Sequence, residues 1–224
     1  LDWYSIVLDG IDLISFYSLP ENHSVATIFS QIEGSNPKIL GEGTSTIYIN
    51  GLGWLGTLTE IESRDGYWVI IDGTDTLDVI GIPEDFSTVY NLHLHTNLIS
   101  YPFAGFSPVE ETIPNSAQSS IDAIIGEGLA AINNNGIWNG SLETLEGTKG
   151  YWFITNNDVS FIFNFPAEGT ARISSPIIRS VPLEFSFNQS TQQAFYFVNS
   201  ATIAGKPIEK DDLIIAYNGD IVVG

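Results

Sequence analysis

The sequence predicts a mainly β protein: two homologous β-rich repeats, each with one short helix, followed by a partial β-sandwich-like strand set. Three observations predict it. Motifs recur at a nearly constant spacing, and short apolar segments alternate with Gly-, Asn- and Pro-containing turns. A hydrophobic content of 43%, with 5 Trp, 9 Tyr and 13 Phe, supplies a core. The predicted boundaries are 1–83 and 84–165 for the repeats, 166–184 for a linker and 185–224 for the last segment.

Five motif pairs in the same order indicate a tandem duplication, because chance does not preserve both order and spacing. Three of these pairs are Leu13-Ile14-Ser15 with Leu98-Ile99-Ser100, Gly41-Glu42-Gly43 with Gly126-Glu127-Gly128, and Gly66-Tyr67-Trp68 with Gly150-Tyr151-Trp152. Asn50-Gly51 also recurs as Asn135-Gly136. The spacing then drops by one before Trp54 and its counterpart Trp138, so one residue is missing there from the second repeat.

In the first repeat, Leu13–Phe16 is predicted as a short strand. Ser24 is placed to cap a helix that ends at Gly34, because Ser favours the N-cap and Gly the position after a helix. Thr46–Ile49 and Leu52–Leu55 then form a hairpin, since Asn50-Gly51 favours a type I′ turn.

The second repeat follows the same plan. Leu98–Tyr101 is its first strand, and Ser107 with Pro108 begins its helix. Gly66–Ile71 and Gly150–Ile154 are aromatic-rich strands of the two repeats. We expect Leu77–Ile80 and Val159–Phe163 to pair beside them.

The last segment predicts strands at Phe185–Phe187, Gln193–Thr202, Leu213–Tyr217 and Asp220–Val223, the last two joined at Asn218-Gly219. Two or three strands are marginal alone and expose an edge. The segment therefore docks on the repeats, accepts strands from another chain, or begins a truncated domain. The predicted assembly edge consists of Leu213, Ile215, Tyr217, Ile221 and Val223.

These motifs resemble a known family. Leu13-Ile14-Ser15 followed by Gly66-Tyr67-Trp68-Val69, repeated in the second half, resembles the "GWNLIS…GYWV" repeat of secreted bacterial and archaeal surface proteins. The leading Gly-Trp-Asn has become Gly10-Ile11-Asp12 and His95-Thr96-Asn97. The tail from Asn188 resembles a β-sandwich module of large exported bacterial proteins. The resemblance implies export and a surface location rather than a reaction.

Charge and composition exclude several classes. Seven Lys and Arg against 27 Asp and Glu give a net charge of −20, which disfavours nucleic acid and anionic membrane surfaces. The sequence lacks a long apolar run, so we expect no membrane insertion. It contains no Cys, which removes disulfides and thiolate chemistry, and no Met, so Leu1 indicates an exported chain with a processed N-terminus, or a fragment.

Four Trp residues are candidate carbohydrate platforms, because flat aromatic rings stack on sugar rings: Trp54, Trp68, Trp138 and Trp152. Packing in the core is the competing interpretation, and for the Tyr-Trp pairs one member of each is expected to be buried, since neighbours on a strand point to opposite faces.

Two groups of aspartates are candidate calcium ligands, because calcium binds six to eight oxygens. Asp72, Asp75 and Asp78 lie in a predicted loop, and Asp211, Asp212 and Asp220 surround the last hairpin. For the first group a solvated turn is the favoured interpretation, because turns favour Asp and Gly. For the second group the competing interpretation is solvation and protection of the strand edge by charge. His93 and His95 would share one face of a strand; no third metal ligand is near them in sequence, so packing is the expected role.

Catalytic motifs are absent: the chain has no Gly-x-Ser-x-Gly elbow, His-Glu-x-x-His motif or P-loop. The repeated Gly-Glu-Gly is interpreted as a structural turn. We therefore expect a non-enzymatic extracellular or cell-surface protein. Its expected partners are other copies of itself, assembled through strand edges into a filament or surface layer. The alternative is a carbohydrate-binding or adhesion module of a larger secreted protein, with surface glycans as partners.

Overall fold

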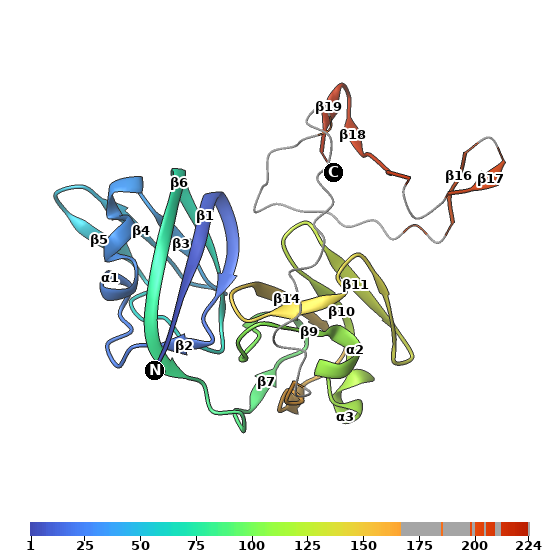
Figure 1. The fold of residues 1–224 in the computed structure, drawn as a ribbon, viewed down its shortest axis with the longest axis horizontal. Helices are drawn as coiled ribbons and strands as arrows, with labels where there is room; N and C mark the ends of the chain where they lie inside the picture. Colours follow the sequence, from blue (N-terminus) through green and yellow to red (C-terminus); the bar gives the residue numbers. More distant parts are fainter. Residues whose placement is uncertain (167–184, 186–197, 199, 204, 209–211, 224) are drawn as a thin grey trace. The chain divides into compact units, whose positions relative to one another are not determined.

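The computed structural model describes the chain except for residues 167–184, 186–197, 199, 204, 209–211 and 224 (Figure 1). The described chain is mainly β, as predicted. It divides into two compact units, Leu1–Ile173 and Ser174–Gly224, so both sequence repeats lie within the first unit. The predicted linker and the strand Gln193–Thr202 lie largely outside the described residues, as do Ser186 and Phe187 of the strand predicted before it.

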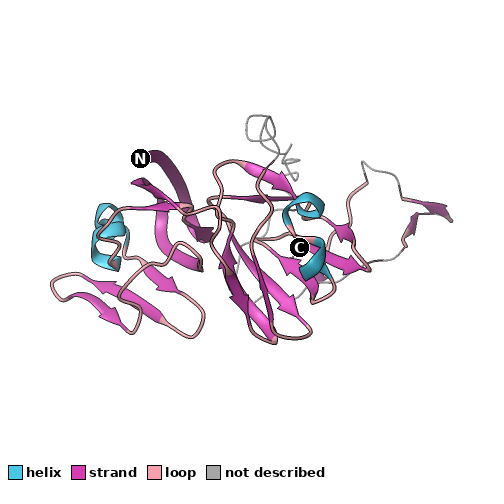
Figure 2. Cartoon of the chain, turned by 90° about the horizontal axis from the view of Figure 1, so that it is seen from below, coloured by secondary structure: helices cyan, strands magenta, loops and turns pink. Residues whose placement is uncertain are grey.

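Each repeat is built on one main antiparallel sheet, and the second repeat has two further two-stranded sheets (Figure 2). The elements of the first repeat are β1 (Asp2–Ser15), β2 (Ser18–Leu19), α1 (Val25–Ile28), the 3-10 helix η1 (Ser30–Ser35), β3 (Lys38–Leu40), β4 (Ser45–Ile49), β5 (Gly53–Gly56) and β6 (Gly66–Pro83). The elements of the second are β7 (Tyr90–Leu92), β8 (His95–Ser100), β9 (Phe106–Pro108), α2 (Val109–Thr112), α3 (Asn115–Gln118), β10 (Ile121–Ile125), β11 (Ala130–Asn134), β12 (Ile137–Gly140), β13 (Thr144–Glu146), β14 (Gly150–Thr155) and β15 (Val159–Phe161).

The two sheets have the same strand order. It is β1-β6-β3-β4-β5 in the first repeat and β8-β14-β10-β11-β12 in the second. The Leu-Ile-Ser strand pairs with the Gly-Tyr-Trp strand in both, with Leu13 opposite Trp68 and Leu98 opposite Trp152. Each repeat encloses its own apolar core, and a third, smaller cluster lies between them.

The hairpin tips explain the missing residue. In the second repeat Asn135 and Gly136 have φ of 54° and 88°, and Asn134 pairs with Ile137, so they form the two-residue type I′ turn. In the first repeat Ile49 pairs with Gly53, and the loop has three residues. Leu52 therefore lies in the turn rather than in the predicted strand, and positive φ falls on Gly51 and Gly53.

Three strand predictions need correction. β1 begins at Asp2, far before Leu13, and β6 continues from Gly66 through Leu77–Ile80 to Pro83. Leu77–Ile80 is thus the continuation of the Gly-Tyr-Trp strand, not its neighbour, and it pairs with the first half of β1. In the second repeat β15 pairs with β7 instead of β14.

The helices are shorter than predicted. Ser24 does cap α1, since its Oγ accepts the Thr27 N–H. A 3-10 turn follows, and it ends at Asn36 in the left-handed conformation rather than at Gly34. In the second repeat Pro108, not Ser107, occupies the N-cap position of α2.

Described residues of the second unit form two isolated hairpins. They are β16 (Thr202–Ile203) with β17 (Lys206–Pro207), and β18 (Tyr217–Asn218) with β19 (Ile221–Val222). Asn218 pairs with Ile221, so the last turn is Gly219-Asp220, one residue later than predicted. Gly219 supplies the positive φ of 63° at the first turn position. Most of the predicted strand Leu213–Tyr217 is not strand; only Tyr217 belongs to β18.

Candidate functional site

The two repeats bind each other through reciprocal hydrogen bonds. The Leu13 N–H donates to the Glu127 carboxylate at 3.0 Å, and the Leu98 N–H donates to the Glu42 carboxylate at 2.8 Å. The Ser15 N–H donates to the Thr148 carbonyl at 3.1 Å, and the Ser100 N–H to the Arg64 carbonyl at 3.0 Å. Each repeat therefore supplies the acceptors for backbone N–H groups of the Leu-Ile-Ser strand in the other repeat.

The Gly-Glu-Gly motif is a turn, as predicted, and it also positions these carboxylates. Gly41 N–H donates to Thr44 O at 2.9 Å, and Gly126 N–H to Leu129 O at 2.8 Å. Gly43 and Gly128 have φ of 70° and 67°, a conformation that favours glycine. Sequence reasoning missed the inter-repeat role of the glutamates, although their occurrence in both copies was the signal.

Apolar side chains fill the space between the repeats. Leu13, Trp68 and Leu98 are at most 5% exposed and form the third cluster, against which Trp152 packs. Gly66 and Gly150 allow the close approach: an added Cβ would lie 2.9 Å from the Leu98 side chain at Gly66 and 2.8 Å from the Ile14 carbonyl oxygen at Gly150.

The electrostatics of the two glutamates differ. Burial raises the pKa of Glu127, with the Leu13 N–H and Lys149 opposing that shift. Glu42 instead accepts a second contact, from His93 Nε2 at 2.7 Å. The hydrogen bond between His93 Nδ1 and the Leu94 carbonyl, together with Glu42, raises the pKa of His93. His93 is exposed and precedes β8. The prediction that His93 and His95 share one face of a strand is therefore wrong.

Geometrically, this interface resembles that of a two-fold dimer, in which residue i of one half meets residue j of the other and the reverse. Such an interface is closed, because each half already occupies the matching surface of its partner. Its chemistry is backbone capping and apolar packing. Any surface for further partners must lie elsewhere on the molecule.

The four candidate tryptophans do not form one exposed surface. Trp68 lies between the repeats and Trp138 in the second core, at 5% and 8% exposure. Trp54 is half-buried on the first core, and its Nε1 donates to Glu33 at 3.1 Å. Trp152 is half-buried. The strongly exposed tryptophan is Trp3, at 66%, which sequence reasoning did not single out.

The aspartates of β6 lie in a strand, not in the predicted loop, and each meets a different partner. Asp72 accepts from Asn36 Nδ2 at 2.8 Å, Asp75 from Ser35 Oγ at 2.6 Å, and Asp78 from Ser5 Oγ at 2.5 Å. Across the part of the chain that the structure describes, no group of three or more His, Asp or Glu is placed to hold a metal ion.

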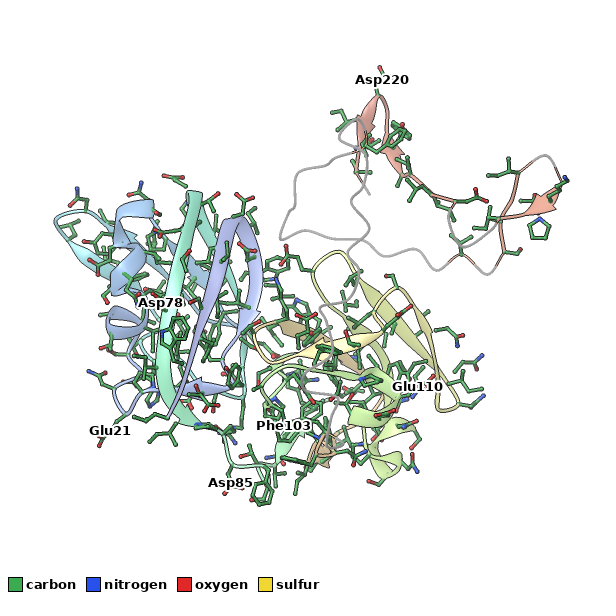
Figure 3. The ribbon with its side chains drawn as sticks, in the orientation of Figure 1. Glu21, Asp78, Asp85, Phe103, Glu110 and Asp220 are labelled. Carbon is green, nitrogen blue, oxygen red and sulfur yellow. The ribbon has the colours of Figure 1, made fainter. Side chains whose placement is uncertain are left out.

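Most of the described C-terminal candidates are exposed. Asp220 lies at the tip of the β18–β19 hairpin (Figure 3), whereas Asp211 lies outside the described residues. Four of the predicted edge residues are at least 47% exposed, and Ile215 is half-buried. The four are Leu213, Tyr217, Ile221 and Val223.

A shallow pocket at the end of β6 contains Ser63, His23 and Glu84 among its lining residues. The Ser63 hydroxyl donates to Glu84, and His23 Nδ1 lies 2.6 Å from the Ile61 carbonyl oxygen. No serine–histidine hydrogen bond is formed in this pocket, so it does not assemble the pair that a nucleophilic serine needs. Among the described helices, none is long and apolar enough to cross a membrane.

A comparison with protein-family models found no match. Comparisons with curated proteins and with solved structures found none either. The resemblance to a secreted repeat family therefore stays a prediction.

Proposed function

We propose that the protein is a non-enzymatic extracellular structural protein whose copies assemble through exposed strand edges. The observation that carries the proposal is the state of the β18–β19 hairpin. Its strands have two residues each, and Tyr217 and Ile221 are 55% and 70% exposed. A two-stranded hairpin is marginal in water, whereas an added strand or sheet edge completes it.

The reciprocal interface supports the same proposal. It makes the two repeats one closed body, so assembly uses other surfaces. The acidic groups with raised pKa values support a structural role as well, because both lie at contacts between the repeats. Glu127 accepts a hydrogen bond from the Leu13 N–H, and Asp65 forms the β-bridge to Ile99. Export rests on the family resemblance and on the acidic composition, which is rich in Asn, Ser, Thr and Gly.

Sedimentation velocity and negative-stain microscopy over a concentration series test this proposal. We expect concentration-dependent polymers for the wild-type chain. Ile221→Asp should abolish them, because a buried unpaired charge is costly at an apolar edge. Ile137→Asp is the matched control, since Ile137 is 63% exposed next to another hairpin turn. Particles that stay monomeric at every concentration would refute the proposal.

The same experiment is carried out with calcium and with a chelator. The described residues form no metal-binding cluster within one copy, and an ion that bridges carboxylates of two copies would promote assembly. Loss of polymers on chelation would assign such a role to the acidic surface, and polymers that persist would exclude it.

Carbohydrate binding is the second candidate, favoured by Trp54. Its half-buried ring lies beside Tyr48, with ring centroids 5.4 Å apart. Glycan-array binding that is lost in Trp54→Ala would support this function.

A further inference from the structure

Among the described residues, the outer edge of the first half of β1 is open. Within the described chain, the backbone of residues 2–8 pairs with β6 alone. Further along the same strand, Leu13 and Ser15 turn their N–H groups to the second repeat. The open stretch therefore continues an edge that the molecule already uses for binding.

The first half of β1 and the second half of β6 form a two-stranded ribbon, residues 2–9 with 74–81. The other edge of this ribbon, along β6, is covered. The Gln31 side-chain amide donates to the Asp78 carbonyl at 2.8 Å and accepts from the Asp78 N–H at 3.3 Å, as a neighbouring strand would. Ser35 from the same turn bonds to Asp75. Proteins commonly cover sheet edges to prevent unwanted pairing, and here one edge is covered and the other is not.

The exposed face of the ribbon beside the open edge carries apolar side chains on both sides of one polar cross-strand pair, Ser5 with Asp78. Trp3 pairs across the strands with Ile80, and these side chains are 66% and 58% exposed. Val7 and Ile82 are each 63% exposed. The alternate residues Tyr4, Ile6 and Leu8 point into the core. Exposed apolar side chains that gather on one face beside an open strand edge form a candidate interaction surface.

Charge selects the partner for this edge. The unit Leu1–Ile173 has four basic and 22 acidic residues, a net charge of −18, so pairing β1 with β1 of a second copy would oppose two strongly acidic bodies. Ser174–Gly224 has three basic and five acidic residues, a net charge of −2. Docking the second unit on the first therefore meets much less repulsion.

We infer that the open edge of β1 receives the β18–β19 hairpin of a second copy, with the exposed hairpin side chains covering Trp3 and Ile80. This inference rests on the proposed function and names its acceptor surface. The contact joins two different surfaces, so it is head-to-tail and extends into a filament unless the rotation closes a ring.

Cysteine cross-linking tests the inference on a clean background, because the chain has no cysteine. One copy carries Ser5→Cys, at the middle of the open edge, and the other carries Asn218→Cys in β18. The two are mixed and treated with a short bismaleimide, which tolerates an unknown register. The control replaces Ser5→Cys with Ser160→Cys, an exposed strand serine of the second repeat.

We expect a mixed dimer from Ser5→Cys with Asn218→Cys and little from the control. Trp3→Lys should weaken self-association at least about tenfold, as for an aromatic anchor at an interface. Cross-links only between Ser5→Cys copies would show β1–β1 pairing and overturn the inference. A chain that carries both Ser5→Cys and Asn218→Cys is tested at high dilution as well, and an intrachain cross-link in it would also overturn the inference. Polymers that form without the mixed cross-link would refute this contact while leaving the proposed function intact.

Discussion

The two repeats share their strand order and their contacts, yet differ at positions where the sequence has changed. Asp12 and Asn97 show what has been retained: an Asp12 oxygen accepts the Asp9 N–H at 2.7 Å, and an Asn97 oxygen accepts the His93 N–H at 2.9 Å. The charge differs and the acceptor oxygen does not. Contacts that build the strand ends are therefore kept by chemistry rather than by residue identity.

The repeats also keep the contact of the Gly-Tyr-Trp tyrosine. The Tyr67 hydroxyl accepts the Glu62 N–H at 2.8 Å, and the Tyr151 hydroxyl accepts the Glu146 N–H at 2.7 Å. Outside these contacts the repeats diverge most in the ribbon. In the first repeat β1 and β6 are long strands of 14 and 18 residues, and their far halves form the ribbon. In the second repeat the separate strands β7 and β15 have three residues each. The shared parts hold the repeats together, and the unshared ribbon carries the candidate docking surface.

The largest expected effect tests the reciprocity of the interface. Leu13→Ala and Leu98→Ala should each lower the free energy of unfolding by about 3 kcal/mol, because each removes a fully buried side chain and leaves a cavity. Urea denaturation measures both. Leu129→Ala, at 43% exposure, should change little. A loss below about 1 kcal/mol at only one of the two leucines would break the symmetry of the comparison.

A smaller effect separates Asp65 from Lys149, its counterpart in the second repeat. Both form the β-bridge to the other repeat. Burial, with Glu62 adding to it, raises the pKa of Asp65 to about 6. A raised carboxyl pKa means that the folded state binds the proton more tightly, so stability present at about pH 4 declines as the pH rises through about 6.

Asp65→Asn should remove that decline, a change of no more than about 1 kcal/mol because the side chain is partly exposed and screened. The measurement is the free energy of unfolding at several pH values between about 4 and 7. Lys149→Gln should leave the pH dependence in this range unaltered. An Asp65→Asn chain that retains the full decline would assign it to another carboxyl group.

Short-range patterns in the sequence predict part of the local structure correctly. Asn135-Gly136 forms its type I′ turn because that dipeptide tolerates positive φ at both positions, and Ser24 caps its helix because its hydroxyl replaces a missing acceptor. Leu52 was misplaced because one extra residue changes the loop type, and both loops begin with the same dipeptide.

Long-range features could not be read from periodicity. The segment from Asp72 to Asp78 is rich in Asp, Thr and Gly, which indicates a loop, but β1 pairs with it from Thr74 onward, and Asp72 and Gly73 lie at an irregularity in the pairing. The contacts of Glu42 and Glu127 depend on how two distant segments meet. Only their reciprocal placement, rather than the motif itself, shows that they join the repeats.

The smallest expected effect concerns Gly10 and His95, the first residues of the two degraded Gly-Trp-Asn motifs. They have φ of 75° and 86°, so both require the left-handed region, and His95 adopts it with a side chain. Gly10→Ala should cost about 1 kcal/mol, which reports backbone conformation alone because no atom lies within 4 Å of the added methyl group. His95→Gly should stabilise the chain by roughly 0.5 kcal/mol, since relief of the strained φ outweighs the greater freedom of glycine when unfolded. Thermal and urea unfolding measure both changes. Destabilisation by His95→Gly would mean that the histidine side chain contributes a contact whose energy exceeds the backbone cost, and the position would then distinguish the repeats by function rather than by drift.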